Sequence, residues 1–148
     1  SAACRVGAIL GSLPENKENA LSHFGMKTGT AFQMADDILD YMADEGKLGK
    51  HLGKDLREGK ITLPVIYLLK VATDAEVRVV KNIIKDGFKQ GDLKRIRELF
   101  KKHNVLTRSF KKAYDLISDA KAELEMFPHS TAKEALFTVA DYVLSRGK

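Results

Sequence analysis

The sequence predicts an all-α helical bundle, and two observations carry this prediction. Apolar residues recur at spacings of three and four far more often than they alternate, which is the period of an α-helix and not of a β-strand. Only 3 of the 148 residues are proline, so few positions interrupt a helix. With 44% hydrophobic residues and no internal repeat or linker, residues 1–148 are expected to form a single helical region with a buried core.

Composition and charge exclude several classes of protein. The single cysteine, Cys4, is expected to be a small core residue; it excludes an internally disulfide-stapled secreted scaffold and favours a cytoplasmic protein. No run of about 18 apolar residues is present, so we expect no membrane-spanning segment. The 25 basic and 20 acidic residues leave a net charge of +5, dispersed and without a recognition motif, so we expect no nucleic-acid partner.

Seven helices are expected, and particular residues mark the breaks between them. Residues 11–14, Gly-Ser-Leu-Pro, end a first helix before a long one, and the glycine- and lysine-rich segment 44–60 is expected to be a loop. Pro128 marks the break before the last helix, where Thr131 and Glu134 have the spacing of a capping box. The expected helices cover residues 2–10, 15–43, 62–72, 75–88, 92–103, 107–127 and 131–145.

The helix expected over 107–127 has an apolar face. Its apolar residues follow spacings of three and four, which predicts core packing and not a lipid or cofactor surface. The residues on this face are Leu106, Phe110, Ala113, Ile117, Ala120, Leu124 and Phe127.

The long helix expected over 15–43 carries two different faces. At about 100° per residue, one arc collects the residues expected to face the core. These are Leu21, Phe24, Thr28, Phe32, Ala35, Leu39 and Met42. A second arc collects Gln33, Asp36, Asp37, Asp40 and Asp44.

The acidic arc is a candidate metal site. Carboxylates four residues apart, such as Asp36 and Asp40, destabilise a helix by roughly a few tenths of a kcal/mol, and no lysine or arginine between Gln33 and Asp44 relieves them. Hard oxygen ligands on one stripe suit Mg²⁺, which takes one or two carboxylates and keeps positions for phosphate oxygens. A solvated acidic face is the alternative, although aspartate lowers helix propensity and its repetition here favours a function.

The segment 44–60 is basic and rich in glycine. It holds Gly46, Gly49, Gly53 and Gly59 together with Lys47, Lys50, Lys54, Arg57 and Lys60. Glycines let backbone amides approach an anion and ammonium groups neutralise it, so diphosphate is the expected ligand. The spacing is not that of a P-loop, and no strand precedes it. The alternative is a solvated loop, but its position beside the acidic arc favours a metal–diphosphate complex.

Two neighbouring stretches carry a resemblance to a known family. The first reads Gly29-Thr-Ala-Phe-Gln-Met-Ala-Asp-Asp-Ile-Leu-Asp40, and the second contains Leu48-Gly-Lys50, Gly53-Lys-Asp-Leu56 and Glu58-Gly-Lys-Ile-Thr-Leu-Pro64. They resemble the second aspartate-rich motif and the lysine-bearing loop of the trans-polyprenyl diphosphate synthases, and are most similar to the long-chain bacterial octaprenyl and heptaprenyl enzymes. The resemblance implies the C-terminal half of an isoprenoid-synthase-type fold.

The resemblance also implies a prenyltransferase activity that uses Mg²⁺. In this family, metal ions hold an allylic prenyl diphosphate between two aspartate-rich motifs, and its C–O bond ionises. Isopentenyl diphosphate attacks the resulting cation and then loses a proton. By match, Asp36 is the principal metal ligand, with Asp40 behind it and Asp37 in support.

The remaining implied roles concern the substrates. Gln33 is expected near the reacting allylic end, and Phe32 is expected to line the isoprenoid pocket. Lys50 and Lys60 are expected to bind the allylic diphosphate. Tyr41, beside the acidic arc, is expected to be a packing residue.

The sequence departs from the family pattern in one large respect. No other Asp-Asp-x-x-Asp is present, so the first aspartate-rich motif is missing, and the opening on small apolar residues predicts an upstream portion. We expect this chain to be the C-terminal portion of a synthase, inactive alone, with the N-terminal half as its partner; the resemblance further implies a homodimer. The alternative is a non-catalytic helical module that docks onto a complete synthase.

The basic stretch 94–103 is expected to be a solvated helix face.

Overall fold

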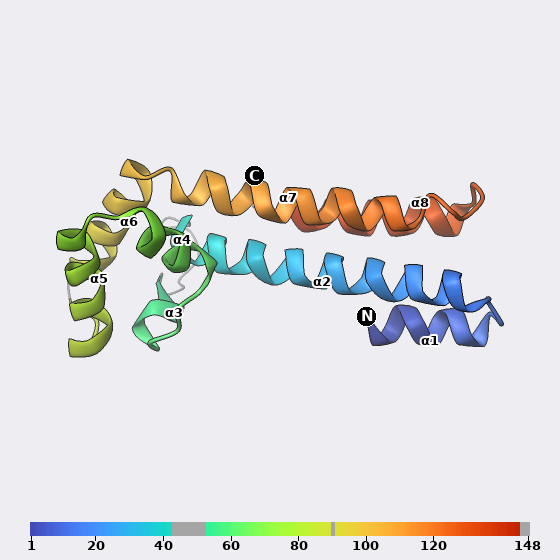
Figure 1. Cartoon of the computed structure of the whole chain (residues 1–148), viewed down its shortest axis with the longest axis horizontal. Coiled ribbons are helices and arrows are strands. Elements are labelled where there is room, and N and C mark those ends of the chain that lie inside the picture. The colour runs from blue at the N-terminus through green and yellow to red at the C-terminus, as the bar shows by residue number, and fades with distance from the viewer. Residues whose placement is uncertain (43–52, 90, 146–148) are drawn as a thin grey trace. The chain divides into compact units, whose positions relative to one another are not determined.

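The computed structural model describes residues 1–42, 53–89 and 91–145, and in this part of the chain every regular element is a helix (Figure 1). The all-α prediction is confirmed. The helices are α1 (Ala2–Leu10), α2 (Glu15–Met42), α3 (Lys54–Arg57), α4 (Leu63–Val71), α5 (Asp74–Asp86), α6 (Asp92–Lys102), α7 (Val105–Glu123) and α8 (Thr131–Ser145).

Three details differ from the sequence prediction, each for a local reason. Helix α3 lies inside the segment predicted as a loop. Helix α7 ends four residues early, because Phe127 and its neighbours form tight turns, with the Phe127 amide donating to the Leu124 carbonyl at 3.0 Å. The capping box predicted at the start of α8 is wrong: the Ser130 hydroxyl accepts the amide of Lys133 at 3.2 Å and caps that helix.

The described residues form two compact units. The terminal unit comprises Ser1–Ala35 with Lys111–Lys148, and the central unit comprises Asp36–Phe110. Both boundaries fall inside a helix, α2 in one case and α7 in the other, and not in a linker. The two units are described separately below.

The terminal unit is built from α1, most of α2, most of α7 and α8. In Figure 1, α1 runs beside α2 and α8 runs beside α7. A side-chain Cβ at Gly25 would lie 2.8 Å from the Cys4 Sγ and 2.9 Å from the Ser1 nitrogen, so glycine is what lets α1 approach α2 so closely. The predicted apolar face of α7 is confirmed as core. The buried residues of this core are Phe24, Ala31, Ala113, Ile117, Ala120, Leu124, Ala140 and Val143.

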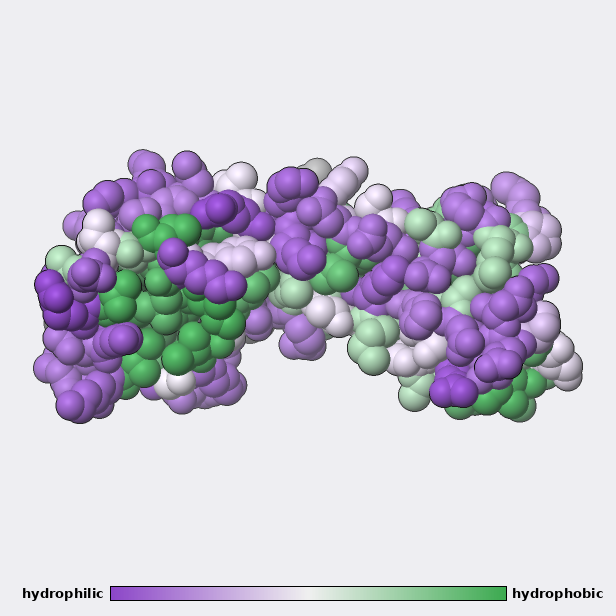
Figure 2. Space-filling model, in the orientation of Figure 1, coloured by the Kyte–Doolittle hydropathy of each residue, from purple (hydrophilic) through white to green (hydrophobic). Residues whose placement is uncertain are grey.

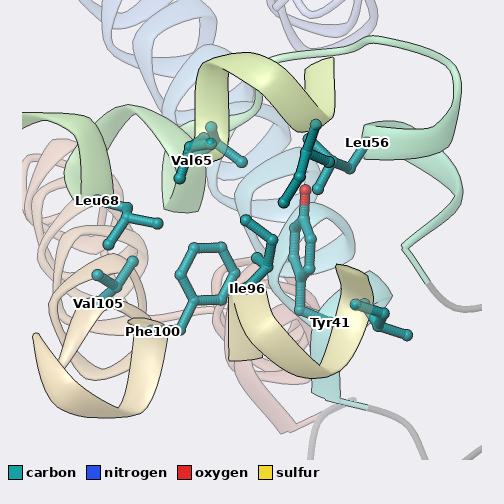
Figure 3. Packing of buried hydrophobic residues seen from close by; sticks show 10 residues of the cluster. Tyr41, Leu56, Val65, Leu68, Ile96, Phe100 and Val105 are labelled. Atoms are coloured by element: carbon teal, nitrogen blue, oxygen red, sulfur yellow. The ribbon is translucent and has the colours of Figure 1, made fainter. Parts of the chain in front are cut away.

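The central unit has its own core, which Figure 3 shows from close by. The rings of Tyr41 and Phe100 meet edge to face, with centroids 4.9 Å apart. Tyr41 is therefore a packing residue, as predicted, and burial raises its pKa to about 12. The buried residues are Tyr41, Leu56, Val65, Leu68, Val80, Ile83, Leu93, Ile96, Phe100 and Val105.

The buried face of α2 shifts along the helix. In the central unit Ile38 and Tyr41 are fully buried, whereas Met42 is 44% exposed. The prediction that Met42 faces the core is therefore wrong. Most of the other buried residues of this core lie on α3 to α6, with Val105 on α7. These neighbours contact a different side of α2 from the one that the predicted apolar arc selects.

Glu76 joins α5 to α6. Its carboxylate accepts the Thr73 amide at 2.8 Å and completes a capping box at the start of α5, and it pairs with the Lys102 Nζ at 2.8 Å and the His103 Nε2 at 3.1 Å. The Lys102 ammonium and then the Thr73 and His103 hydrogen bonds lower the pKa of Glu76 from 4.5 to about 2.

Among the described residues, no helix has the length and hydropathy needed to cross a bilayer.

The substitution Glu76→Gln is expected to destabilise the protein near neutral pH. Because the pKa of Glu76 in the folded protein lies below its ordinary value of 4.5, this contribution to stability is present above pH 4.5 and is lost as the pH falls toward about 2. Denaturant unfolding of the variant and of wild type should therefore differ most near neutral pH and converge in acid. Glu98→Gln, at an exposed position of α6, is the control. A difference that stays constant with pH would contradict this account.

Candidate functional site

The last two turns of α2 carry the predicted carboxylate face. Asp36, Asp37 and Asp40 are half-buried and belong to the central unit. The other two predicted residues of this helix, Phe32 and Gln33, belong to the terminal unit. Phe32 packs partly buried against its core, and Gln33 is exposed.

Asp40 connects the end of α2 to the start of α3. Its Oδ1 accepts the Lys54 amide at 3.2 Å, and its Oδ2 accepts the Asp55 amide at 3.1 Å. Its backbone carbonyl accepts the Gly53 amide at 3.0 Å. The Asp40 carboxylate thus satisfies amides at the start of a helix that follows 14 residues later, a role that its own helix position does not predict.

Gly53 makes this junction sterically possible. Its φ of 67° lies in the left-handed region, which costs other residues about 1–2 kcal/mol. A Cβ at this position would also lie 2.9 Å from the Cδ1 of Leu93. The backbone turn that presents three amides to Asp40 therefore favours glycine.

Asp37 shows the electrostatic consequence of placing several carboxylates together. Burial, followed by the negative charges of Asp55, Asp36 and Asp40, raises the pKa of Asp37 from 3.8 to about 6, against the opposing charge of Lys60. Burial also raises the pKa of Asp40, although the two amide hydrogen bonds oppose it. A group of carboxylates with raised pKa values concentrates negative charge that a bound cation would relieve.

Lys60 lies in the same electrostatic environment. Its ammonium group pairs with the Glu58 Oε2 at 2.7 Å and with the Asp55 Oδ1 at 3.3 Å, and these contacts raise its pKa. The side chain nevertheless remains 58% exposed. The structure thus brings Lys60 to the carboxylate face, whereas Lys50, the other predicted lysine, lies outside the described residues.

Asp55 is a member of this group that the sequence analysis did not select. It is the strongest charged contributor to the raised pKa of Asp37, and it also pairs with Lys60. The signal was its place in the Gly53-Lys-Asp-Leu56 stretch, two residues after the glycine that permits the turn.

The carboxylate oxygens of these aspartates are suitable ligands for a hard cation, and they supply part of its coordination shell. Carboxylate oxygens are the ligands that Mg²⁺ prefers. Within residues 1–42, 53–89 and 91–145, however, no three acidic, histidine or cysteine side chains converge closely enough to hold a metal by themselves. Each oxygen of Asp40 already accepts one amide, which leaves each a second lone pair.

Comparison with known proteins identifies relatives along the whole chain. The sequence profile described as polyprenyl synthetase matches residues 1–101. The short chain isoprenyl diphosphate synthase of Methanothermobacter thermautotrophicus is 36% identical over 146 residues, which is 99% of this chain and 45% of that protein. The octaprenyl diphosphate synthase of Escherichia coli is 32% identical over 147 residues, or 99% of this chain and 46% of the relative.

Solved structures give the same result. A decaprenyl diphosphate synthase from Rhodobacter capsulatus superposes with a TM-score of 0.87 at 35% identity, covering 99% of this chain and 45% of that one. A polyprenyl synthase from Caulobacter crescentus, complexed with calcium and isoprenyl diphosphate, gives a TM-score of 0.88 at 36% identity, covering 99% and 45%. The chain spans less than half the length of these relatives and aligns with their C-terminal part.

The substitution Asp40→Ala is expected to release the start of α3. Without the carboxylate, the amides of Lys54 and Asp55 lose their acceptors, at a cost of about 1 kcal/mol typical of a lost helix cap. Hydrogen exchange in a chelating buffer should show faster exchange at these two amides. Asp40→Asn, which keeps one acceptor oxygen, should show an intermediate effect. Unchanged exchange at both amides in Asp40→Ala would contradict the assignment.

Proposed function

The chain belongs to the polyprenyl synthetase family, and we propose that it supplies the C-terminal part of a prenyltransferase active site. The substrates are an allylic prenyl diphosphate and isopentenyl diphosphate. The observation that carries the proposal is the half-buried carboxylate face of α2, joined by Asp40 to the segment that bears Lys60. The relatives are isoprenyl, octaprenyl and decaprenyl diphosphate synthases, which supports this substrate class.

Mg²⁺ is the proposed cofactor, with Asp36 as its proposed principal ligand and Asp37 in support. Asp40 joins them through the lone pairs that its two amide hydrogen bonds leave. When bound, the metal supplies charge neutralisation at the leaving diphosphate. The raised pKa of Asp37 supports a cation here, because uncompensated carboxylates gain most from one. The relative from Caulobacter crescentus was solved with calcium and isoprenyl diphosphate, which also supports a metal–diphosphate ligand.

Lys60 is the proposed diphosphate-binding cation. The Lys60 side chain remains largely exposed to solvent, and solvent-exposed ion pairs such as those with Glu58 and Asp55 contribute little to stability, so the ammonium group can exchange onto a phosphate oxygen. There it stabilises the charge that develops as the C–O bond breaks. Three further roles rest on the family resemblance. We propose that Lys50 also binds the diphosphate, that Gln33 lies near the reacting allylic end, and that Phe32 lines the isoprenoid pocket.

The N-terminal half of a synthase is the proposed partner. The first aspartate-rich motif is not part of these 148 residues, so the facing half of the metal site must come from elsewhere. Apolar surface is available for it: Ile61 is 49% and Ile66 39% exposed, and Figure 2 shows hydrophobic surface over the part of the central unit around α4. A homodimer and a cytoplasmic location complete the proposal.

A non-catalytic helical module that docks onto a complete synthase is the second candidate. The exposed apolar residues of α1 favour it, because an interaction module needs such a surface. They are Val6, Ile9 and Leu10. A docking module has no need of Mg²⁺ or of the Asp36 carboxylate, and this difference separates the two candidates.

The activity can be tested in a fusion of the N-terminal half of the Escherichia coli relative to this chain. We expect the fusion, once its helicity is verified, to incorporate labelled isopentenyl diphosphate into longer products and the chain alone to incorporate none. Asp36→Asn should lower the rate by about a hundredfold, because one carboxylate charge at the metal is lost. Asp86→Asn, at an exposed position of α5, is the matched control. Equal losses in both variants would contradict the proposed site.

A further inference from the structure

Two buried hydroxyl groups of the central unit make no hydrogen bond within the part of the chain that the structure describes. They are the hydroxyl of Tyr41, near the end of α2, and the hydroxyl of Thr62, directly before α4. The Tyr41 residue as a whole is only 1% exposed. Buried polar groups are almost always hydrogen-bonded in folded proteins, so two hydroxyls that lack a bond in the same unit indicate a role beyond packing.

The contacts of the rest of the Tyr41 residue fix the place of its hydroxyl. The ring meets that of Phe100 edge to face, with 4.9 Å between the centroids, and the backbone carbonyl accepts the Arg97 Nε at 2.7 Å. Figure 3 shows the hydroxyl oxygen pointing toward Leu56 of α3. Because the ring is closely packed, the hydroxyl cannot turn away to reach solvent.

Thr62 occupies the N-cap position of α4 without capping the helix. A threonine at this position usually accepts the amide of the second or third helical residue. Here the second residue is Pro64, which has no amide, and no side-chain cap bond is present. An interaction with the Thr62 hydroxyl acts against the burial that raises the pKa of Tyr41, so the two hydroxyls lie close together. The Thr62 hydroxyl is therefore a possible partner for that of Tyr41.

Thr62 also belongs to the connection that carries Lys60. This connection joins α3 to α4, and Thr62 follows Lys60 by two residues. The Lys60 amide donates to the Asp55 carbonyl at 2.8 Å, which holds the beginning of the connection. The Thr62 side chain adds no such bond at its end. A hydrogen bond between the Thr62 and Tyr41 hydroxyls would hold both ends and restrict the positions that the Lys60 ammonium group can reach.

We propose that Tyr41 is a positioning residue for Lys60, and that its hydroxyl forms a hydrogen bond with the Thr62 hydroxyl when Lys60 binds a phosphate oxygen. This inference rests on the proposed function. Lys60 has to leave Glu58 and Asp55 to reach a phosphate, and a shift of the connection that allows this also brings Thr62 to Tyr41. The bond then adds to the affinity for diphosphate and not to the stability of the chain without diphosphate.

Tyr41→Phe tests the proposal, because it keeps the ring and removes the hydroxyl. Calorimetric titration of the chain with inorganic diphosphate in Mg²⁺ should show binding about fivefold weaker than that of wild type, the effect of one lost hydrogen bond between neutral groups. Denaturant unfolding without diphosphate should show a stability equal to or above that of wild type, because the hydroxyl that is removed has no partner there.

Two further variants sharpen the test. Thr62→Val should also weaken diphosphate binding, and the double variant should bind no more weakly than either single variant, because all three lack the same bond. Tyr67→Phe is the matched control: Tyr67 of α4 packs partly buried against the same core, and its loss of a hydroxyl should leave the affinity unchanged.

The outcomes separate this inference from the proposed function. If wild type binds diphosphate and Tyr41→Phe binds it equally well, or if Tyr67→Phe weakens binding as much, the inference is overturned and the proposed function stands. Lower stability of Tyr41→Phe without diphosphate would show a purely structural hydroxyl and would overturn the inference as well. Failure of the folded wild-type chain to bind diphosphate in Mg²⁺ would overturn the inference together with the proposed function.

Discussion

The capture of three backbone amides by Asp40 is the interaction on which the candidate site depends. The amides of Gly53, Lys54 and Asp55 would otherwise lack acceptors at the start of α3, and a half-buried carboxylate would lack donors. The hydrogen bonds between Asp40 and these amides satisfy the donors and the acceptors together, and they hold α3 against the end of α2. Asp55 and Lys60 then come within electrostatic reach of Asp37, which is the arrangement that a cation and a diphosphate require.

Repulsion among its carboxylates makes the carboxylate face locally destabilising, and other parts of the central unit offset this effect. Placing Asp36, Asp37 and Asp40 on two turns concentrates like charge, and burial raises the pKa of Asp37 to about 6. Lys60 lowers this pKa only in part. Tyr41 follows Asp40 in sequence, and the hydrophobic core that it forms with its neighbours (Figure 3) supplies stabilisation that the charged residues do not. Residues that lower local stability in this way are typical of a functional site.

Periodic patterns predicted most of the fold, and long-range contacts account for what they missed. The spacing of Ala113, Ile117 and Ala120 predicted the core face of α7, because helix geometry alone sets it. The exposure of Met42 could not be predicted, since the neighbours of α2 change along its length. Helix α3 is too short for a period and depends on an acceptor 14 residues earlier. The aspartate motif selected Asp36, Asp37 and Asp40, but only the folded chain shows Asp55 beside them.

Paramagnetic relaxation by Mn²⁺, a substitute for Mg²⁺, tests most directly whether the carboxylate face binds a metal with diphosphate. Amide spectra of the isotope-labelled chain would be recorded with inorganic diphosphate and increasing Mn²⁺. The account predicts that signals from Asp36, Asp37 and Lys60 broaden first. Broadening centred elsewhere in a folded chain, or none at all, would contradict it.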